Sequence, residues 1–395
     1  MRRGFGGSLR RAGILLVVLS LGGCKAIGLS PDQFGFVMPF GSAAPSAAPT
    51  AAPSPSPSPS AAPPSAFTDD LVARAQAEGA LTTIGFGSGN CGFTQLTDGF
   101  QMRYGISVNV QQPGATTTQE LDALKSGGAA GPDAVILGYG SAVQAATGDL
   151  LATYRVADWG QIPDNAKDAG GAWYGSYFGT ISFEVNTKVV KHIPKSWSDL
   201  LKPEYKHLVA LNASPLKSSV AAFAVWGAAL ANGGSVDDIR PGIAYFKQLA
   251  KVGNLLSVGV TPAELTAGKA GIRIDFTWDT VYAQSRSGGV LKAVIPTDGR
   301  IGDALRNAVS ASAPHPWAAR LWEEYLLADE GQNAYLSDLC TPIRLSSMIA
   351  AGTADTTALA AVPDVSDTHL PSPSQIGQAY DDLSAGWAST GITIP

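Results

Sequence analysis

The 395-residue sequence has only three cysteines and four histidines, and 15% of its residues are charged. The histidines lie far apart, without the spacing typical of a metal site: His192, His207, His315 and His369. The chain lacks the Gly-x-Ser-x-Gly, His-Glu-x-x-His and Gly-Lys-Ser/Thr motifs of common enzyme classes. After residue 24, no apolar run is long enough to span a membrane. The sequence therefore marks neither an enzyme nor a metalloprotein, and we expect no cofactor.

Basic charge is also scarce. The whole chain carries a net charge of −5, and the four arginines before Cys24 are its only charged residues there. Without that segment, 23 basic residues face 32 acidic ones, a net charge of −9. Nucleic acids require a basic surface on their partners. An acidic body therefore argues against a nucleic-acid partner.

The N-terminus combines a basic start with a short apolar run. Arg2, Arg3, Arg10 and Arg11 precede the apolar segment 12–21, and Leu21-Gly22-Gly23-Cys24 follows. This layout predicts a secretory signal over residues 1–23. Its last four residues resemble the lipobox of bacterial lipoproteins, in which the cysteine is acylated. The resemblance implies an exported protein held at the outer face of the cell membrane, or in the periplasm, by lipid on Cys24. The export route, general secretory or twin-arginine, stays open.

Residues 24–66 predict a tether. Ser42–Ser65 consists almost entirely of Ala, Pro, Ser and Thr. Such a segment has nothing to bury, and its prolines favour extended polyproline geometry. We expect it to space the folded body away from the membrane.

The two remaining cysteines, Cys91 and Cys340, permit two interpretations. Outside the cytoplasm a disulfide between them would persist. Two buried free thiols are the alternative, because the sequence alone does not give the distance between the two cysteines.

The body after residue 67 reads as an α/β fold. Short β-branched runs alternate with amphipathic stretches, which is typical of a sheet covered by helices. The long extended stretch 172–185 is a candidate to cross between two lobes, and 290–296 would return the chain. Expected strands are 81–86, 106–110, 133–137, 208–211 and 270–276. Expected helices are 93–103, 118–125, 195–201, 218–231, 241–252, 261–266, 314–327, 331–339 and 374–387. The remainder after residue 350 reads as loop.

With these segments placed, the chain resembles a type II solute-binding protein of bacterial ABC importers, in the branch with polyamine- and iron(III)-binding members. The resemblance rests on the order of several phrases over residues 71–344: 133–140 with Gly148-Asp149-Leu150, 185–188, 194–211, 265–270, 313–316 and 329–332. It implies two lobes, residues 67–180 with 297–395 and residues 181–296, joined by two crossing strands around a ligand cleft. It also implies a receptor, monomeric and not an enzyme, that delivers a small molecule to a permease and its ATPase.

Two kinds of candidate ligand residue follow from the pattern. Turns between a strand and a helix offer backbone N–H groups that favour an anion. Three such turns also contain hydroxyl or amide side chains. The candidate residues in these turns are Ser88, Gly89, Asn90, Tyr139, Ser141, Ser218 and Ser219. A second group places Asp279 beside Trp278 and Tyr282, with Tyr177 on the crossing strand. A carboxylate near aromatic faces suits an ammonium group. Ordinary caps and core packing are the alternatives in both cases.

We prefer a polyamine-like or other amine-bearing solute, because of Asp279 and the family branch. An anionic or zwitterionic solute, or an iron(III) complex, is the alternative. Iron-binding relatives use two adjacent tyrosines about where this chain has Thr277-Trp278, and the sequence contains no Tyr-Tyr pair. A cell-surface hydrolase is the alternative from another class.

Overall fold

A computed structural model of the chain describes residues 69–86 and 91–395. The predicted signal (1–23), Cys24, the tether (24–66) and three turn residues, Ser88, Gly89 and Asn90, lie outside the described residues. By its contacts the chain divides into two units, residues 1–60 and 61–395, so all of the described structure belongs to the second. Within these residues, no helix combines the length and apolarity needed to cross a membrane.

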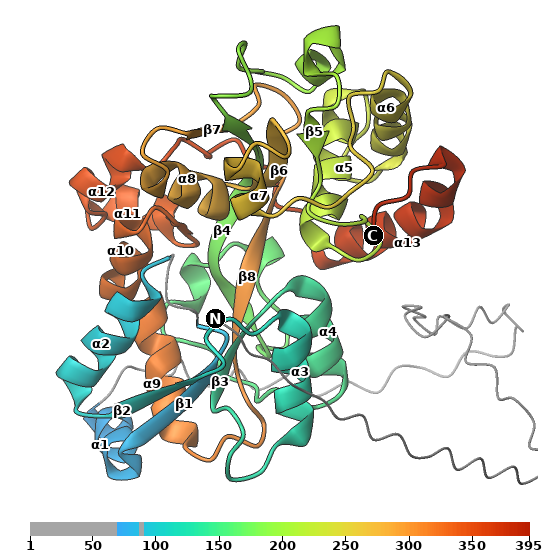
Figure 1. Cartoon of the computed structure of the whole chain (residues 1–395). Helices are drawn as coiled ribbons and strands as arrows, with labels where there is room; N and C mark the ends of the chain where they lie inside the picture. Colours follow the sequence, from blue (N-terminus) through green and yellow to red (C-terminus); the bar gives the residue numbers. More distant parts are fainter. Residues whose placement is uncertain (1–68, 87–90) are drawn as a thin grey trace, which may run out of the picture. The chain divides into compact units, whose positions relative to one another are not determined.

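The described residues form strands β1 to β9 and helices α1 to α13 (Figure 1). The strands are β1 Ala80–Ile84, β2 Ser107–Gln111, β3 Ala134–Leu137, β4 Tyr174–Asn186, β5 Val209–Ala210, β6 Ile272–Phe276, β7 Leu291–Val294, β8 Gly302–Val309 and β9 Thr341–Pro342. The helices are α1 Asp69–Glu78, α2 Phe93–Tyr104, α3 Thr117–Ser126, α4 Tyr139–Thr147, α5 Ser219–Ala231, α6 Arg240–Lys251, α7 Pro262–Thr266, α8 Thr277–Arg286, α9 Pro316–Leu327, α10 Asp329–Ser337, α11 Leu345–Ala351, α12 Thr356–Ala361 and α13 Pro373–Gly386.

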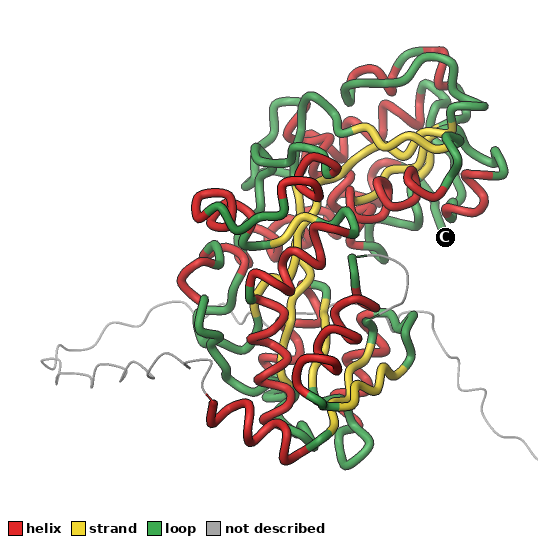
Figure 2. The backbone as a smooth tube through the Cα atoms, turned by 90° about the vertical axis from the view of Figure 1, so that its left-hand side faces the viewer, coloured by secondary structure: helices red, strands yellow, loops and turns green. Residues whose placement is uncertain are grey.

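Strand β4 links two groups of elements. The strand order is β2-β1-β3-β8-β4-β6-β5, and β7 and β9 also pair with β4. The first half of β4 pairs with β8, whereas its second half, from Ile181 to Asn186, pairs with β6 and β7. Figure 1 shows β4 and β8 running between a lower group with β1 to β3 and an upper group with β5 to β7. In the side view of Figure 2, strands continue through both groups, with helices on either side. The predicted crossing strand and the two-lobed α/β class are confirmed.

Strand β8 was not predicted from the sequence. Residues 290–296 were expected to return the chain, but β7 pairs with the end of β4, and β8 is the second long strand beside it. Its buried residues include Asp303, Arg306 and Asn307. Asp303 accepts a hydrogen bond of 2.7 Å from Arg306, so the charges offset each other inside the sheet. Because these residue types usually face water, the sequence of this segment resembles that of a loop and gives no sign of a buried strand.

Helix α5 is buried on almost every side, because small residues let neighbouring elements approach it. A β-carbon on Gly242 of α6 would lie 1.9 Å from the carbonyl oxygen of Val225 in α5. The two helices therefore pack with their backbones nearly in contact.

The C-terminal part differs from the sequence prediction in two ways. The stretch after residue 350 was expected to be loop, but α11 extends to Ala351 and α12 follows it. Helix α13 was grouped with the first lobe (297–395), but it packs against α5 and α6 of the second. The rings of Trp387, just after α13, and Phe246 of α6 are 6.1 Å apart. The long segment after α12 therefore contributes to the core of the second group.

Candidate functional site

Tyr177 on β4 is where residues from distant parts of the chain meet. Its side chain is 3% exposed. Its ring centroid lies 6.1 Å from that of Phe93, at the start of α2, and 5.7 Å from that of Trp278, at the start of α8. Tyr335 of α10 completes the group at 5.3 Å. Because α2 belongs to the first group of elements and α8 to the second, Tyr177 lies where the two groups join.

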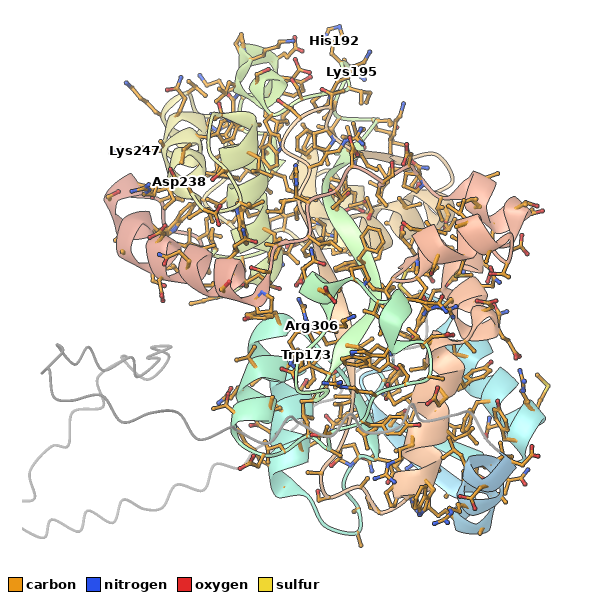
Figure 3. The ribbon with its side chains drawn as sticks, turned by 180° about the vertical axis from the view of Figure 1, so that it is seen from behind. Trp173, His192, Lys195, Asp238, Lys247 and Arg306 are labelled. Atoms are coloured by element: carbon orange, nitrogen blue, oxygen red, sulfur yellow. A yellow bond between two sulfur atoms is a disulfide. The ribbon has the colours of Figure 1, made fainter. Side chains whose placement is uncertain are left out.

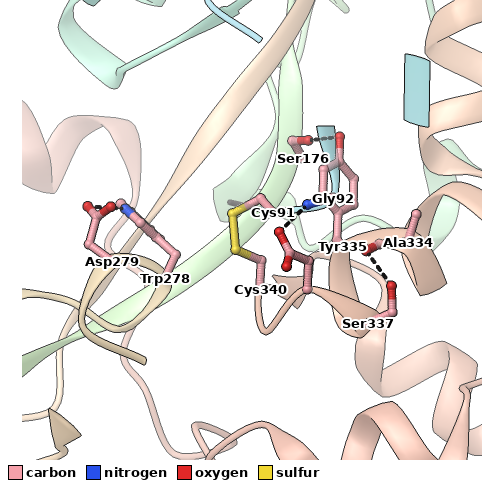
Figure 4. Close-up of a disulfide and its surroundings, with 10 residues drawn as sticks. Cys91, Gly92, Ser176, Trp278, Asp279, Ala334, Tyr335, Ser337 and Cys340 are labelled. Carbon is pink, nitrogen blue, oxygen red and sulfur yellow. Dashed lines mark hydrogen bonds between the residues drawn. A yellow bond between two sulfur atoms is a disulfide. The ribbon is translucent and has the colours of Figure 1, made fainter. Parts of the chain in front are cut away.

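Trp278 and Asp279 occupy the first turn of α8, directly after β6. The indole of Trp278 stacks on Phe276 with a centroid distance of 4.2 Å. Its N–H donates a hydrogen bond of 3.0 Å to Asp279 Oδ2 (Figure 4). The start of α8 is held to β4 by two further contacts: the Thr180 N–H donates to Thr277 Oγ1 at 3.2 Å, and the Ser182 and Thr280 hydroxyls are 2.7 Å apart. The carboxyl group of Asp279 is therefore rigidly placed.

Asp279 lies near a buried ionic network. Arg273 on β6 donates from Nε to Glu184 Oε2 at 2.8 Å and contacts Asp275 Oδ2 through Nη1 at 2.5 Å. Burial, assisted by the charge of Asp275 and opposed by Arg273, raises the pKa of Asp279 to about 7. Among these four groups, three carboxyls face one guanidinium. The region therefore has more carboxyl groups than cations, and a bound ammonium group would favour their ionised forms.

A disulfide between Cys91 and Cys340 anchors one side of this group (Figure 4). The Gly92 N–H beside it donates to Asp338 Oδ2 at 2.8 Å. The residues that follow Cys340 form β9, which pairs with Tyr177 and Phe178. The cross-link thus ties the start of α2 to the strand that lies beside Tyr177.

Tyr139 and Ser141 lie in the first turn of α4, at the carboxyl end of β3. The Tyr139 hydroxyl donates to the carbonyl oxygen of Pro373 at 2.7 Å. The Arg306 guanidinium lies 5.1 Å from the Tyr139 ring centroid and 5.6 Å from that of Trp173 (Figure 3). Within the described contacts, neither Tyr139 nor Ser141 touches Tyr177 or Asp279.

The other predicted residues also have local roles. Ser218 is the N-cap of α5: its hydroxyl accepts from the Ala221 N–H at 3.3 Å and donates to Asn212 Oδ1 at 2.9 Å. Ser219 is exposed. The Tyr282 ring lies 5.0 Å from the Arg286 guanidinium on the same helix. Of the predicted residues, the structure brings together Tyr177, Trp278 and Asp279.

Sequence reasoning missed Arg273, Glu184 and a third buried residue, Glu120 on α3. Arg273 and Glu184 face each other across β4 and β6. Only the strand register creates that pairing, since the residues are 89 positions apart. Glu120 follows an N-terminal capping box and has the sequence signature of an exposed helix residue. No local signal could have identified it.

Among the described residues, no three His, Cys, Asp or Glu side chains form a group able to hold a metal ion. His315 contacts Asp133 through Nδ1 at 2.9 Å, at the start of α9. Two small cavities lie elsewhere, one lined by Trp173, Tyr174 and Glu323 and one between α5 and α13. Neither cavity is lined by Asp279.

Solved structures with this fold are described with chemically different solutes. Iron-bound HitA from Pseudomonas aeruginosa is 19% identical, with a TM-score of 0.60 over 79% of this chain and 99% of that one. AfuA from Actinobacillus pleuropneumoniae, with bound fructose-6-phosphate, is 20% identical, with a TM-score of 0.61 over 78% and 98%. A spermidine/putrescine ABC transporter protein from Listeria monocytogenes is 14% identical, with a TM-score of 0.55 over 80% and 99%. At these identities the likeness shows the type II periplasmic-binding-protein fold and does not select a ligand.

No curated protein matches the chain significantly. The profile of the family described as bacterial extracellular solute-binding protein matches residues 95–363, more than half of the chain. Proteins of this kind act outside the cytoplasm, bind a small molecule for an ABC importer and are not enzymes. The chain therefore belongs to the bacterial extracellular solute-binding proteins.

Proposed function

We propose that this receptor is anchored by lipid on Cys24 and captures a small amine-bearing solute, polyamine-like in chemistry, for its permease. The observation that carries the choice of solute is the placement of Asp279. Its carboxyl group stands at the start of α8, beside Trp278, near Tyr177 and next to an ionic network with excess carboxyl groups. An ammonium group would pair with the ionised carboxyl group and would also gain from nearby aromatic rings.

Capture would work through closure of the two lobes. The aromatic group at Tyr177 joins elements of both lobes along the crossing strand. A solute that contacts both lobes stabilises the closed form, because only that form makes all the contacts at once. The permease would recognise the closed form, and its ATPase would supply the free energy of transport. The tether would keep capture close to the membrane.

The alternative solutes have weaker support. An anion at the start of α5 would meet Ser218, but that hydroxyl already donates to Asn212 and accepts from Ala221. An iron(III) complex would need oxygen ligands in place of the absent tyrosine pair. The hydrolase alternative is set aside, because proteins of the family are not enzymes.

Thermal-shift measurements on the full chain test the solute class. Putrescine and spermidine should raise the melting temperature, while iron(III) citrate, an aminophosphonate and phosphate should not. Asp279→Asn should abolish the shift, and Asp98→Asn, at an exposed position of α2, should preserve it. Stabilisation by one of the other compounds, or an unchanged amine response in Asp279→Asn, would overturn the assignment.

A further inference from the structure

Glu120 of α3 is a buried carboxyl group close to the candidate site. It is 2% exposed. It packs on Gly85, just after β1: a β-carbon there would lie 1.7 Å from Glu120 Oε1. Gly85 also has a φ of +80°, so this position suits glycine for two reasons. The carboxyl group therefore rests against the backbone at the carboxyl end of β1, the edge where α/β sheets bind ligands.

The described groups around Glu120 supply neither a hydrogen bond to its Oε2 nor a cation to pair with it. Its Oε2 is buried and has no hydrogen-bond partner among the described residues. No described cation offsets it: burial alone raises its pKa, to about 9. An unsatisfied buried polar group costs roughly 1–3 kcal/mol, and such groups are rare in folded proteins. A bound ligand that supplies the missing partner would remove that cost.

Tyr177 connects Glu120 with Asp279. Burial and then Tyr335 are the main causes of the raised pKa of the Tyr177 hydroxyl, and the charges of Asp279 and Glu120 add smaller contributions, so both carboxyl groups lie within electrostatic range of it. The Phe86 ring, one residue after Gly85, lies 5.1 Å from Phe93, which contacts Tyr177 at 6.1 Å. The end of β1 and the start of α8 thus approach the same tyrosine from the two lobes.

We propose that Glu120 forms a second amine subsite in addition to the Asp279 subsite, so that the receptor selects a solute with two ammonium groups. This inference rests on the proposed function, since it assigns the second amine of the same solute. Glu120 stands in the first turn of α3, where the helix dipole favours a carboxylate once a cation has arrived.

Binding of an ammonium group at this subsite changes the protonation state of Glu120. In the empty protein Glu120 is the neutral acid at pH 7.5, because its pKa is about 9. An arriving ammonium group pairs with the carboxylate, so the Glu120 proton leaves to solvent while the ammonium keeps its own. Binding of a diamine at pH 7.5 should therefore release close to one proton from Glu120 per solute.

Calorimetric titration of the full chain with putrescine and with 1-aminobutane tests the proposal. The two probes have the same four-carbon chain but differ in the number of amines. Glu120→Gln resembles the neutral acid in shape, so the variant should fold. It should bind putrescine at least about tenfold more weakly, a loss of about 1.4 kcal/mol, and bind 1-aminobutane unchanged. Titration in buffers of different ionisation enthalpy should show that the proton release at Glu120 is lost.

A matched control and a conservative variant complete the design. Glu323 of α9 is also a buried glutamate with an unpartnered oxygen, and its other oxygen accepts from Tyr174; Glu323→Gln should bind putrescine normally. Glu120→Asp should recover part of the affinity. If Glu120→Gln binds putrescine like the parent chain with the same proton release, the second subsite is wrong while the Asp279 site stands. If Asp279→Asn also leaves amine binding intact, the proposed function itself fails.

Discussion

Trp278 lies directly against the backbone of Gly179: a β-carbon at Gly179 would come within 2.5 Å of Trp278 Cε3 and 2.8 Å of Thr277 Oγ1. The missing side chain on β4 is what lets the first turn of α8 rest on the crossing strand. The position of Asp279, the next residue, depends on this contact.

Gly179→Ala should therefore displace Trp278 and weaken both the fold and amine binding. Overpacking of this kind costs about 1–3 kcal/mol, which chemical denaturation would measure. Gly160→Ala is the control, since a β-carbon there meets nothing within 4 Å. Equal stability of the two variants would show that α8 does not need this close contact.

Binding of a monoamine should depend on pH near neutrality. The pKa of Asp279 is about 7 in the empty protein, so the carboxylate is present above pH 7 and lost below it. The amine stays charged throughout, because its own pKa is near 10. Affinity for 1-aminobutane should fall up to about tenfold per unit between pH 6.5 and pH 5. A flat profile in the parent chain would contradict the role of Asp279.

Asp279 should destabilise the folded state of the empty protein at high pH. Its folded-state pKa of about 7 exceeds the unfolded value of about 3.9, so the folded state binds more protons between these limits. The contribution of Asp279 to stability therefore decreases as pH rises from 4 to 7. Asp279→Asn, which keeps an acceptor for the Trp278 N–H, should melt higher than the parent at pH 8, and the difference should shrink at pH 5. A larger gain at pH 5 would reverse this sign and reject the argument.

Loss of the disulfide should destabilise the body. The Cys91–Cys340 bond joins two residues that are 249 positions apart in the sequence, and removal of a native disulfide typically costs about 2–5 kcal/mol. Cys91→Ser with Cys340→Ser should lower the melting temperature and increase proteolysis near α2. Reduction of the parent chain should reproduce the shift, and reduction of the double variant should add nothing. An unchanged melting temperature would show that the surrounding core already holds these segments.

The lipid anchor can be tested in cells. Export of the parent chain in the presence of an alkynyl fatty acid should label it and place it in the membrane fraction. Cys24→Ala should be unlabelled and absent from that fraction, because an acyl chain contributes about 0.8 kcal/mol per buried CH₂ to membrane binding. Label retained in the variant would move the acylation site elsewhere.

Local patterns predicted much of the fold, and the exceptions share a cause. The 172–185 stretch was recognisable because aromatic and β-branched residues recur along it without a proline, and β4 occupies Tyr174–Asn186. Strand β8 was not recognisable, since it contains Asp303, Arg306 and Asn307, polar residues that the folded sheet buries and of which Asp303 and Arg306 pair with each other. The grouping of α13 also escaped, because its amphipathic pattern does not specify which helices it covers.

The candidate site divides in the same way. The Trp278-Asp279 pair could be found from sequence, because a carboxylate beside aromatic residues after a strand is a local pattern. Glu120 and the Arg273 network could not. Their significance comes from burial and from neighbours such as Gly85 and Glu184, which the chain brings together only on folding.

The sequence by itself determined the alternation of strands and helices, the family resemblance and the expectation of an acylated Cys24, since these depend on residue order alone. Only the tertiary structure decided that Tyr177 meets elements of both lobes, that Cys91 joins Cys340 and that Glu120 is a buried acid whose Oε2 lacks a partner among the described residues. The physical reason is that solvation and electrostatic energies depend on distance in space, and residues far apart in a chain acquire that distance only when the sheet has formed.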